Sequence, residues 1–115
     1  ALLAGLDDQT LQSRFGGTSL EEYTNKTITS GDELITVLQQ VRRQGYATDD
    51  GEYTHGVFCV AVPITDRTGT VVAAMSCSVP KARLDLGELQ AAQMIDVLTR
   101  QARSVSDALD SRMAG

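Results

Sequence analysis

The stretch from Gly45 to Pro80 reads GYATDDGEYTHGVFCVAVPITDRTGTVVAAMSCSVP, and it decides the fold. Two apolar runs, Phe58 to Thr65 and Thr70 to Val79, flank the sequence DRTG, which has Asp first and Gly last, as β-turns prefer. The pattern predicts an antiparallel hairpin. Its second strand should stop at Pro80, because proline cannot extend the hydrogen-bond ladder.

Small polar side chains stand among the hydrophobic residues of both runs. Cys59 lies on the first, and Ser76, Cys77 and Ser78 lie on the second. A turn over residues 66–69 would place Cys59 opposite Ser76, with Ser78 on the same side by the period of two. Cys77 would then point to the other face. A slip of one residue would instead pair Cys59 with Cys77.

The flanking segments predict helices and one further strand. A helix capped by Asp7 or Asp8 should run to Phe15, and a capping box at Ser30 to Glu33 should open a second helix that ends at Gly45. A short strand is expected at residues 46–47, followed by an acidic loop. The expected apolar faces are Leu34, Leu38 and Val41 with Val37, and, on a long helix from about Leu84 to Arg112, Ile95, Leu98, Ala102, Val105 and Leu109.

Composition limits the class of protein. The chain has 115 residues, enough for one domain with a core, and a net charge of −5, which argues against nucleic-acid binding by this chain. Two cysteines make no disulfide framework, and no signal peptide or long apolar run is visible, so we expect a cytoplasmic protein without a membrane span. The opening residues ALLAGL begin without Met or a helix cap, which indicates a piece of a longer protein.

The chemistry-bearing residues have more than one interpretation. Cys59 fits a pocket wall, an inert core thiol or a nucleophile, and the last would require a nearby base or cation. Ser76 and Ser78 either bond to local backbone or contact a ligand or water. The acidic group of Asp49, Asp50 and Glu52 fits a solvated loop, a metal site or the mouth of a pocket.

Enzymatic alternatives are weaker. A Cys59–His55–Asp49 triad can be written down, but His55 lies only four residues before Cys59, across Gly56 and into a strand. Zinc ligation by Asp49, Glu52, His55 and Cys59 matches no strong spacing pattern. We therefore predict no catalytic residue, no metal and no cofactor. A thiol- or metal-dependent small-molecule hydrolase and a ligand-free dimerisation domain remain as alternatives.

The spaced residues resemble a known family, the IclR-type bacterial transcription regulators, in their effector-binding domain. The similarity spans nearly the whole chain. The matching positions are Thr27 to Ser30, Glu33-Leu34, Val41-Arg42, Gly45 to Ala47, Asp49-Asp50, Glu52, Gly56-Val57, Cys59, Pro63-Ile64, Asp66, Gly69, Ala73-Ala74, Ser76, Ser78, Pro80 and Arg83-Leu84.

The resemblance implies a fold and a function. It implies an α/β (α+β) domain over residues 1–115, with a GAF-like antiparallel sheet flanked by helices and a long C-terminal helix. A DNA-binding winged helix-turn-helix would precede Ala1. The effector, a small organic acid or hydroxylated metabolite, would contact Asp49, Val57, Cys59, Ser76 and Ser78. The full protein would be a homodimer or homotetramer that binds DNA through the missing domain.

Overall fold

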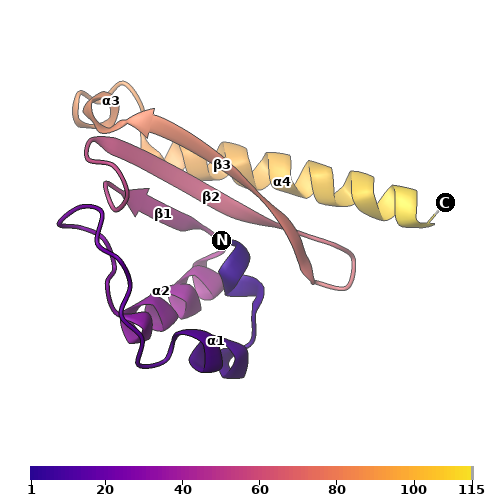
Figure 1. Cartoon of the computed structure of the whole chain (residues 1–115). Helices are drawn as coiled ribbons and strands as arrows, with labels where there is room; N and C mark the ends of the chain where they lie inside the picture. Colours follow the sequence, from indigo (N-terminus) through magenta and orange to yellow (C-terminus); the bar gives the residue numbers. More distant parts are fainter. Residues whose placement is uncertain (115) are drawn as a thin grey trace.

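A three-stranded antiparallel sheet in the order β1-β2-β3 forms the centre of the computed structural model, which describes residues 1–114. Figure 1 shows α4 stretched along the back of this sheet, with α1 and α2 grouped near β1. The elements are η1 (Leu2–Gly5), α1 (Asp8–Phe15), α2 (Gly31–Gln44), β1 (Ala47–Asp50), β2 (Val57–Thr65), β3 (Val71–Pro80), α3 (Lys81–Asp85) and α4 (Ala91–Ala114).

One face of the sheet packs against α4. Along β2 the even-numbered residues are buried and the odd-numbered residues are not, with the exposed Val57 at one end, as a strand with one covered face requires. Helix α4 contributes three residues, each four positions after the last, from its N-terminal half. The buried members of the cluster are Phe58, Val60, Val62, Ile64, Met94, Leu98 and Ala102.

A second apolar cluster joins η1, α1 and α2. It contains the fully buried Leu11, and Ala47 of β1 packs against it. The helix ends are set by the expected caps. The Asp7 carboxylate accepts the Thr10 N–H at 2.7 Å, the Ser30 hydroxyl accepts the Glu33 N–H at 3.3 Å, and Gly45 ends α2 with a φ of +88°.

The helix prediction was wrong in three details. The buried stripe of α2 is Ile35, Leu38 and Val41, whereas Leu34 is half-buried and Val37 is exposed. On α4, Met94 is buried and the expected Val105 is exposed. The predicted single helix from about Leu84 is two helices separated by residues 86–90, where Gly87 adopts a φ of +76° and its N–H bonds to the Leu84 carbonyl at 3.1 Å.

The strands also differ from the prediction. Strand β1 covers Ala47–Asp50, so Asp49 and Asp50 belong to the sheet and not to an acidic loop. Cross-strand pairing with β2 outweighs the low strand propensity of aspartate. No helix in the described part of the chain is long and apolar enough to cross a membrane.

Candidate functional site

Three polar side chains form a row across the sheet. Asp49 pairs with Cys59 between β1 and β2, and Cys59 pairs with Ser78 between β2 and β3. Directly opposed residues of antiparallel strands point to the same face, so the carboxylate, the thiol and the hydroxyl are neighbours. This polar row (Asp49, Cys59 and Ser78) lies on the face of the sheet that α4 does not cover.

The other two predicted site residues lie on the same face. Ser76 is opposite Ala61, and Val57 is opposite Pro80 at the far end of β2. The predicted pairing of Cys59 with Ser76 was wrong, because the register is displaced by two residues. A displacement of two preserves the side to which every residue points. Cys77 pairs with Val60 and therefore belongs to the α4 face, as predicted.

The serine hydroxyls of this face are open to solvent. Ser76 and Ser78 are exposed, and Cys59 is half-buried, with its sulfur 3.8 Å from the Val60 carbonyl oxygen. Among the described residues, neither serine hydroxyl has a hydrogen-bond partner within the protein. Exposed hydroxyls cost little when they bond to water. They are therefore available to donate to a ligand.

A tight turn beyond β1 places a further carboxylate near the polar row. The Asp49 carboxylate accepts the Glu52 N–H at 2.8 Å, and Gly51 takes a φ of +73°. Burial, and then the negative charge of Asp49, raise the pKa of Glu52 above its ordinary value of 4.5. Glu52 belongs to the acidic group singled out from the sequence, but only the fold shows that it lies beside Asp49.

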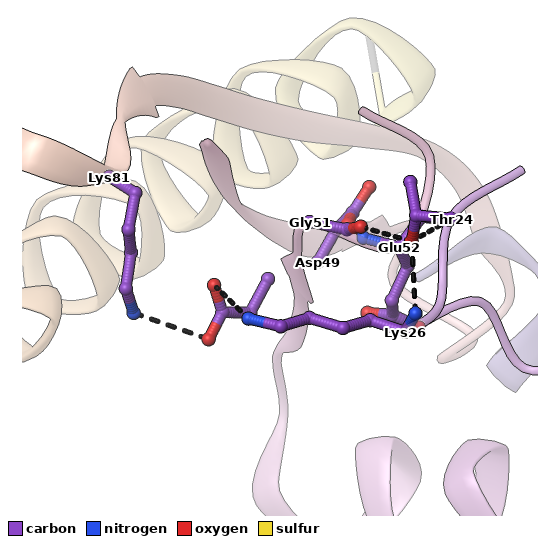
Figure 2. Close-up of polar contacts among 7 residues, drawn as sticks. Thr24, Lys26, Asp49, Gly51, Glu52 and Lys81 are labelled. Atoms are coloured by element: carbon purple, nitrogen blue, oxygen red, sulfur yellow. Dashed lines mark hydrogen bonds and ion pairs between the residues drawn. The ribbon is translucent and has the colours of Figure 1, made fainter. Parts of the chain in front are cut away.

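Loop 18–30 is anchored to this turn by threonine side chains. The buried Thr24 hydroxyl donates to the Gly51 carbonyl at 2.6 Å and accepts the Lys26 N–H at 3.0 Å. The Thr27 hydroxyl donates to the Glu52 carbonyl and accepts the Thr24 N–H at 2.9 Å. These bonds satisfy backbone groups on both segments and hold the turn in place. Figure 2 shows the bonds of Thr24. Sequence alone gave no signal for this pairing.

Asp50 connects two lysines from distant segments. One carboxylate oxygen lies 3.9 Å from the Lys26 ammonium, and the other lies 3.2 Å from the Lys81 ammonium (Figure 2). The Lys81 ammonium also lies 5.3 Å from the centre of the Phe58 ring. These cations neutralise Asp50, so the acidic character that remains at this end of the sheet comes from Asp49 and Glu52.

A hollow of about 400 Å³ opens beside the polar row, between η1, α2 and β1. We call it the α2–β1 hollow. The lining residues are Ala1, Leu3, Ile28, Leu34, Val37, Leu38, Gln40, Val41, Gln44, Ala47, Thr48 and Glu52.

The geometry of the described residues does not favour a catalytic site or a metal site. His55 is exposed in the connection between β1 and β2. Within residues 1–114, no three His, Cys, Asp or Glu side chains gather closely enough to share a metal ion. The open face instead presents one carboxylate acceptor and several neutral donors, which is an arrangement suited to binding a small polar molecule.

Comparisons with known proteins place the chain in a family. The model of the "Bacterial transcriptional regulator IclR C-terminal" family matches residues 1–107. The chain is 39% identical to the HTH-type transcriptional regulator KdgR of Escherichia coli over 91% of its own length and 39% of that protein's. It is 37% identical to the Pca regulon regulatory protein of Pseudomonas putida, over 77% of this chain and 31% of that one. The chain thus spans about two fifths or less of these relatives.

Solved structures agree with the sequence comparisons. The C-terminal domain of E. coli KdgR superposes with a TM-score of 0.81 at 38% identity, covering 95% of this chain and 65% of that one. A putative transcriptional regulator from Rhodococcus sp. RHA1 gives a TM-score of 0.85 at 34% identity, covering 96% and 44%. The chain belongs to the IclR family of bacterial transcription regulators and corresponds to its C-terminal, effector-binding domain.

Family membership confirms two predictions. The α+β fold, with an antiparallel sheet flanked by helices and a long C-terminal helix, is that of the IclR C-terminal domains. The matched relatives are named as regulators and repressors, so the chain is a regulatory domain and not a hydrolase. The predicted effector-binding residues lie on one face of the sheet, and their role in binding stays a prediction. They are Asp49, Val57, Cys59, Ser76 and Ser78.

Proposed function

We propose that this chain senses a small hydroxylated organic acid for a bacterial transcription regulator, with the polar row as the centre of the binding site. The observation that carries the proposal is the alignment of Asp49, Cys59 and Ser78 on the face of the sheet opposite α4. Ser76 and Val57 extend the same surface. The site acts on DNA only through a helix-turn-helix domain elsewhere in the longer protein, in a cytoplasmic homodimer or homotetramer.

The ligand class follows from the donors and acceptors of the row. Asp49 is the only charged group among the five, and as a carboxylate it accepts a hydrogen bond from a ligand hydroxyl. The thiol and the serine hydroxyls donate to a ligand carboxylate, which is then held by dipoles and not by an ion pair. A related structure supports this class. The inducer-binding domain of PobR from Acinetobacter, a double mutant, is bound to 3-hydroxybenzoic acid and is 27% identical to this chain, with a TM-score of 0.74 over 95% of it and 59% of that chain.

Binding should be tested by calorimetry and thermal shift with aliphatic and aromatic hydroxy acids. A ligand at a hundredfold excess over its Kd adds about 2.7 kcal/mol of stability to the folded chain. Ser78→Ala should weaken binding by up to about tenfold, because it removes one neutral hydrogen bond. Ser104→Ala, which alters an exposed serine on α4, should leave affinity unchanged.

Two results would count against the proposal. If no hydroxy acid shifts the unfolding temperature, the alternative of a ligand-free dimerisation domain is favoured. If Ser104→Ala weakens binding as much as Ser78→Ala does, the ligand binds somewhere other than the polar row. Sedimentation of the wild-type chain at several concentrations would then measure self-association directly.

A further inference from the structure

The α2–β1 hollow has the size of a ligand site and adjoins the polar row. Its volume of about 400 Å³ lies within the range of small-molecule pockets. Ala47 lines the hollow and also pairs with Ala61 on the face that carries the row, two residues from Asp49. Two lining residues of the hollow, Ala47 and Glu52, thus lie close to Asp49, and the Glu52 N–H donates to the Asp49 carboxylate at 2.8 Å.

The wall formed by α2 is mostly apolar, with Gln40 and Gln44 as its polar members. Leu34 and Val37 line the hollow, and Val37 keeps 37% of its surface exposed. Valine and leucine at such positions gain about 25 cal/mol for each Å² that a ligand removes from water. Ile28, from loop 18–30, adds to the same wall. A hydrocarbon segment would be favoured here.

A single acidic side chain lines this hollow, and its backbone is held on both sides. The Glu52 N–H donates to Asp49, and the Glu52 carbonyl accepts from the hydroxyl of Thr27. No lysine or arginine among the described residues forms an ion pair with its carboxylate. A carboxylate on a fixed turn, at the edge of an apolar wall, is a directed acceptor for a ligand hydroxyl.

We propose that Glu52 and the apolar wall of α2 extend the effector site, so that it takes an acid whose apolar body ends in a hydroxyl group bound by the Glu52 carboxylate. The inference rests on the proposed function and narrows its ligand class. The acid group lies at the polar row, the body crosses Leu34 and Val37, and the terminal hydroxyl reaches Glu52. A simple short hydroxy acid fills only the first part of this site.

The experiment compares ω-hydroxy acids of short and medium chain length with alkanoates of the same length, measured by calorimetry on this chain. The wild type should prefer the ω-hydroxy compound, and Glu52→Ala should reduce that preference about tenfold, because a hydrogen bond to a charged group is lost. Glu22→Ala is the matched control, since it removes the same charge from an exposed position in loop 18–30. It should leave the preference unchanged.

A second pair of variants tests the apolar wall without touching Glu52. Val37→Ala should weaken the binding of medium-chain acids more than that of short acids. Val97→Ala, which alters an exposed valine on α4, should change the binding of neither. One outcome overturns only this inference: acids bind and Ser78→Ala weakens their binding, but Glu52→Ala leaves the preference for ω-hydroxy acids unchanged and Val37→Ala leaves the preference for medium-chain acids unchanged. If no acid binds the wild type, the proposed function itself fails.

Discussion

Cys59 lies directly opposite Ser78 in the β2–β3 pairing, with both side chains on the face that α4 leaves uncovered. The chain's other cysteine, Cys77, precedes Ser78 and is exposed on the α4 face. Two thiols close together in the sheet thus face opposite sides. This arrangement provides an internal control for any experiment on the proposed site.

Alkylation of the two cysteines should respond differently to ligand. Cys77 should react faster with iodoacetamide in the free protein, because it is exposed and Cys59 is half-buried. A bound hydroxy acid should slow the reaction of Cys59 and leave that of Cys77 unchanged. Mass spectrometry of the Cys59→Ala and Cys77→Ala variants separates the two rates. Equal protection of both thiols would place the ligand outside the polar row.

Thr24→Val should lower the free energy of unfolding by about 1–3 kcal/mol, because it leaves the Gly51 carbonyl without its buried donor. Urea unfolding monitored by circular dichroism measures the change. Thr36→Val is the matched control, since Thr36 is an exposed threonine on α2, and its effect should stay within about 0.5 kcal/mol. Similar losses in both variants would mean that loop 18–30 is not anchored through Thr24.

The raised pKa of Glu52 predicts a pH dependence of stability. Burial first, and the charge of Asp49 second, disfavour the ionised form in the folded state, so the folded protein holds the proton more tightly than the unfolded chain does. Stability should therefore fall as pH rises from the ordinary value of 4.5 through the raised pKa. Glu52→Gln should remove this fall in urea-unfolding curves. A wild-type curve parallel to that of the variant would contradict the prediction.

The lowered pKa of Asp66, at the hairpin turn, predicts the opposite dependence of stability on pH. Its carboxylate accepts the Thr68 hydroxyl at 2.5 Å and the N–H groups of Thr68 and Thr70 at 2.8 and 3.1 Å, and these bonds, the hydroxyl first, hold the pKa of Asp66 below 3.8. Its contribution should be present above pH 3.8 and be lost as pH falls through the depressed pKa. Asp66→Asn should be less stable than wild type at neutral pH, with the difference shrinking in acid. An NMR titration of Asp66 checks the pKa directly.

Local capping signals in the sequence were sufficient to predict where α2 begins and ends. Ser30 and Gly45 carry the cap chemistry of α2, and both were confirmed at the expected positions. The break between α3 and α4 was missed because the apolar periodicity continues through Leu84 on one side and Ala91 on the other. Gly87 was the available signal, since a left-handed residue there ends one helix before the next begins.

The register of the hairpin required more than sequence. The Asp66 N–H bonds to the Thr70 carbonyl at 2.9 Å, so the closing loop is one residue longer than the predicted turn. A bulge between Ile64 and Thr65 adds a second displacement. Each shift displaces the pairing by one residue, so together they displace it by two. The predicted partner of Cys59 was therefore wrong, but the predicted face of its side chain was correct. The hollow between α2 and β1 depends on long-range packing, which no local pattern encodes.

The carboxylate of Asp50 joins a loop before the sheet, through Lys26, to the first residue of α3 after it, through Lys81. Asp50 follows Asp49 directly in β1. Asp50 points to the opposite face from Asp49, so its ion pairs hold β1 in place without occupying the polar row. The edge strand of the sheet is in this way fastened to two segments that lie far from it in the sequence.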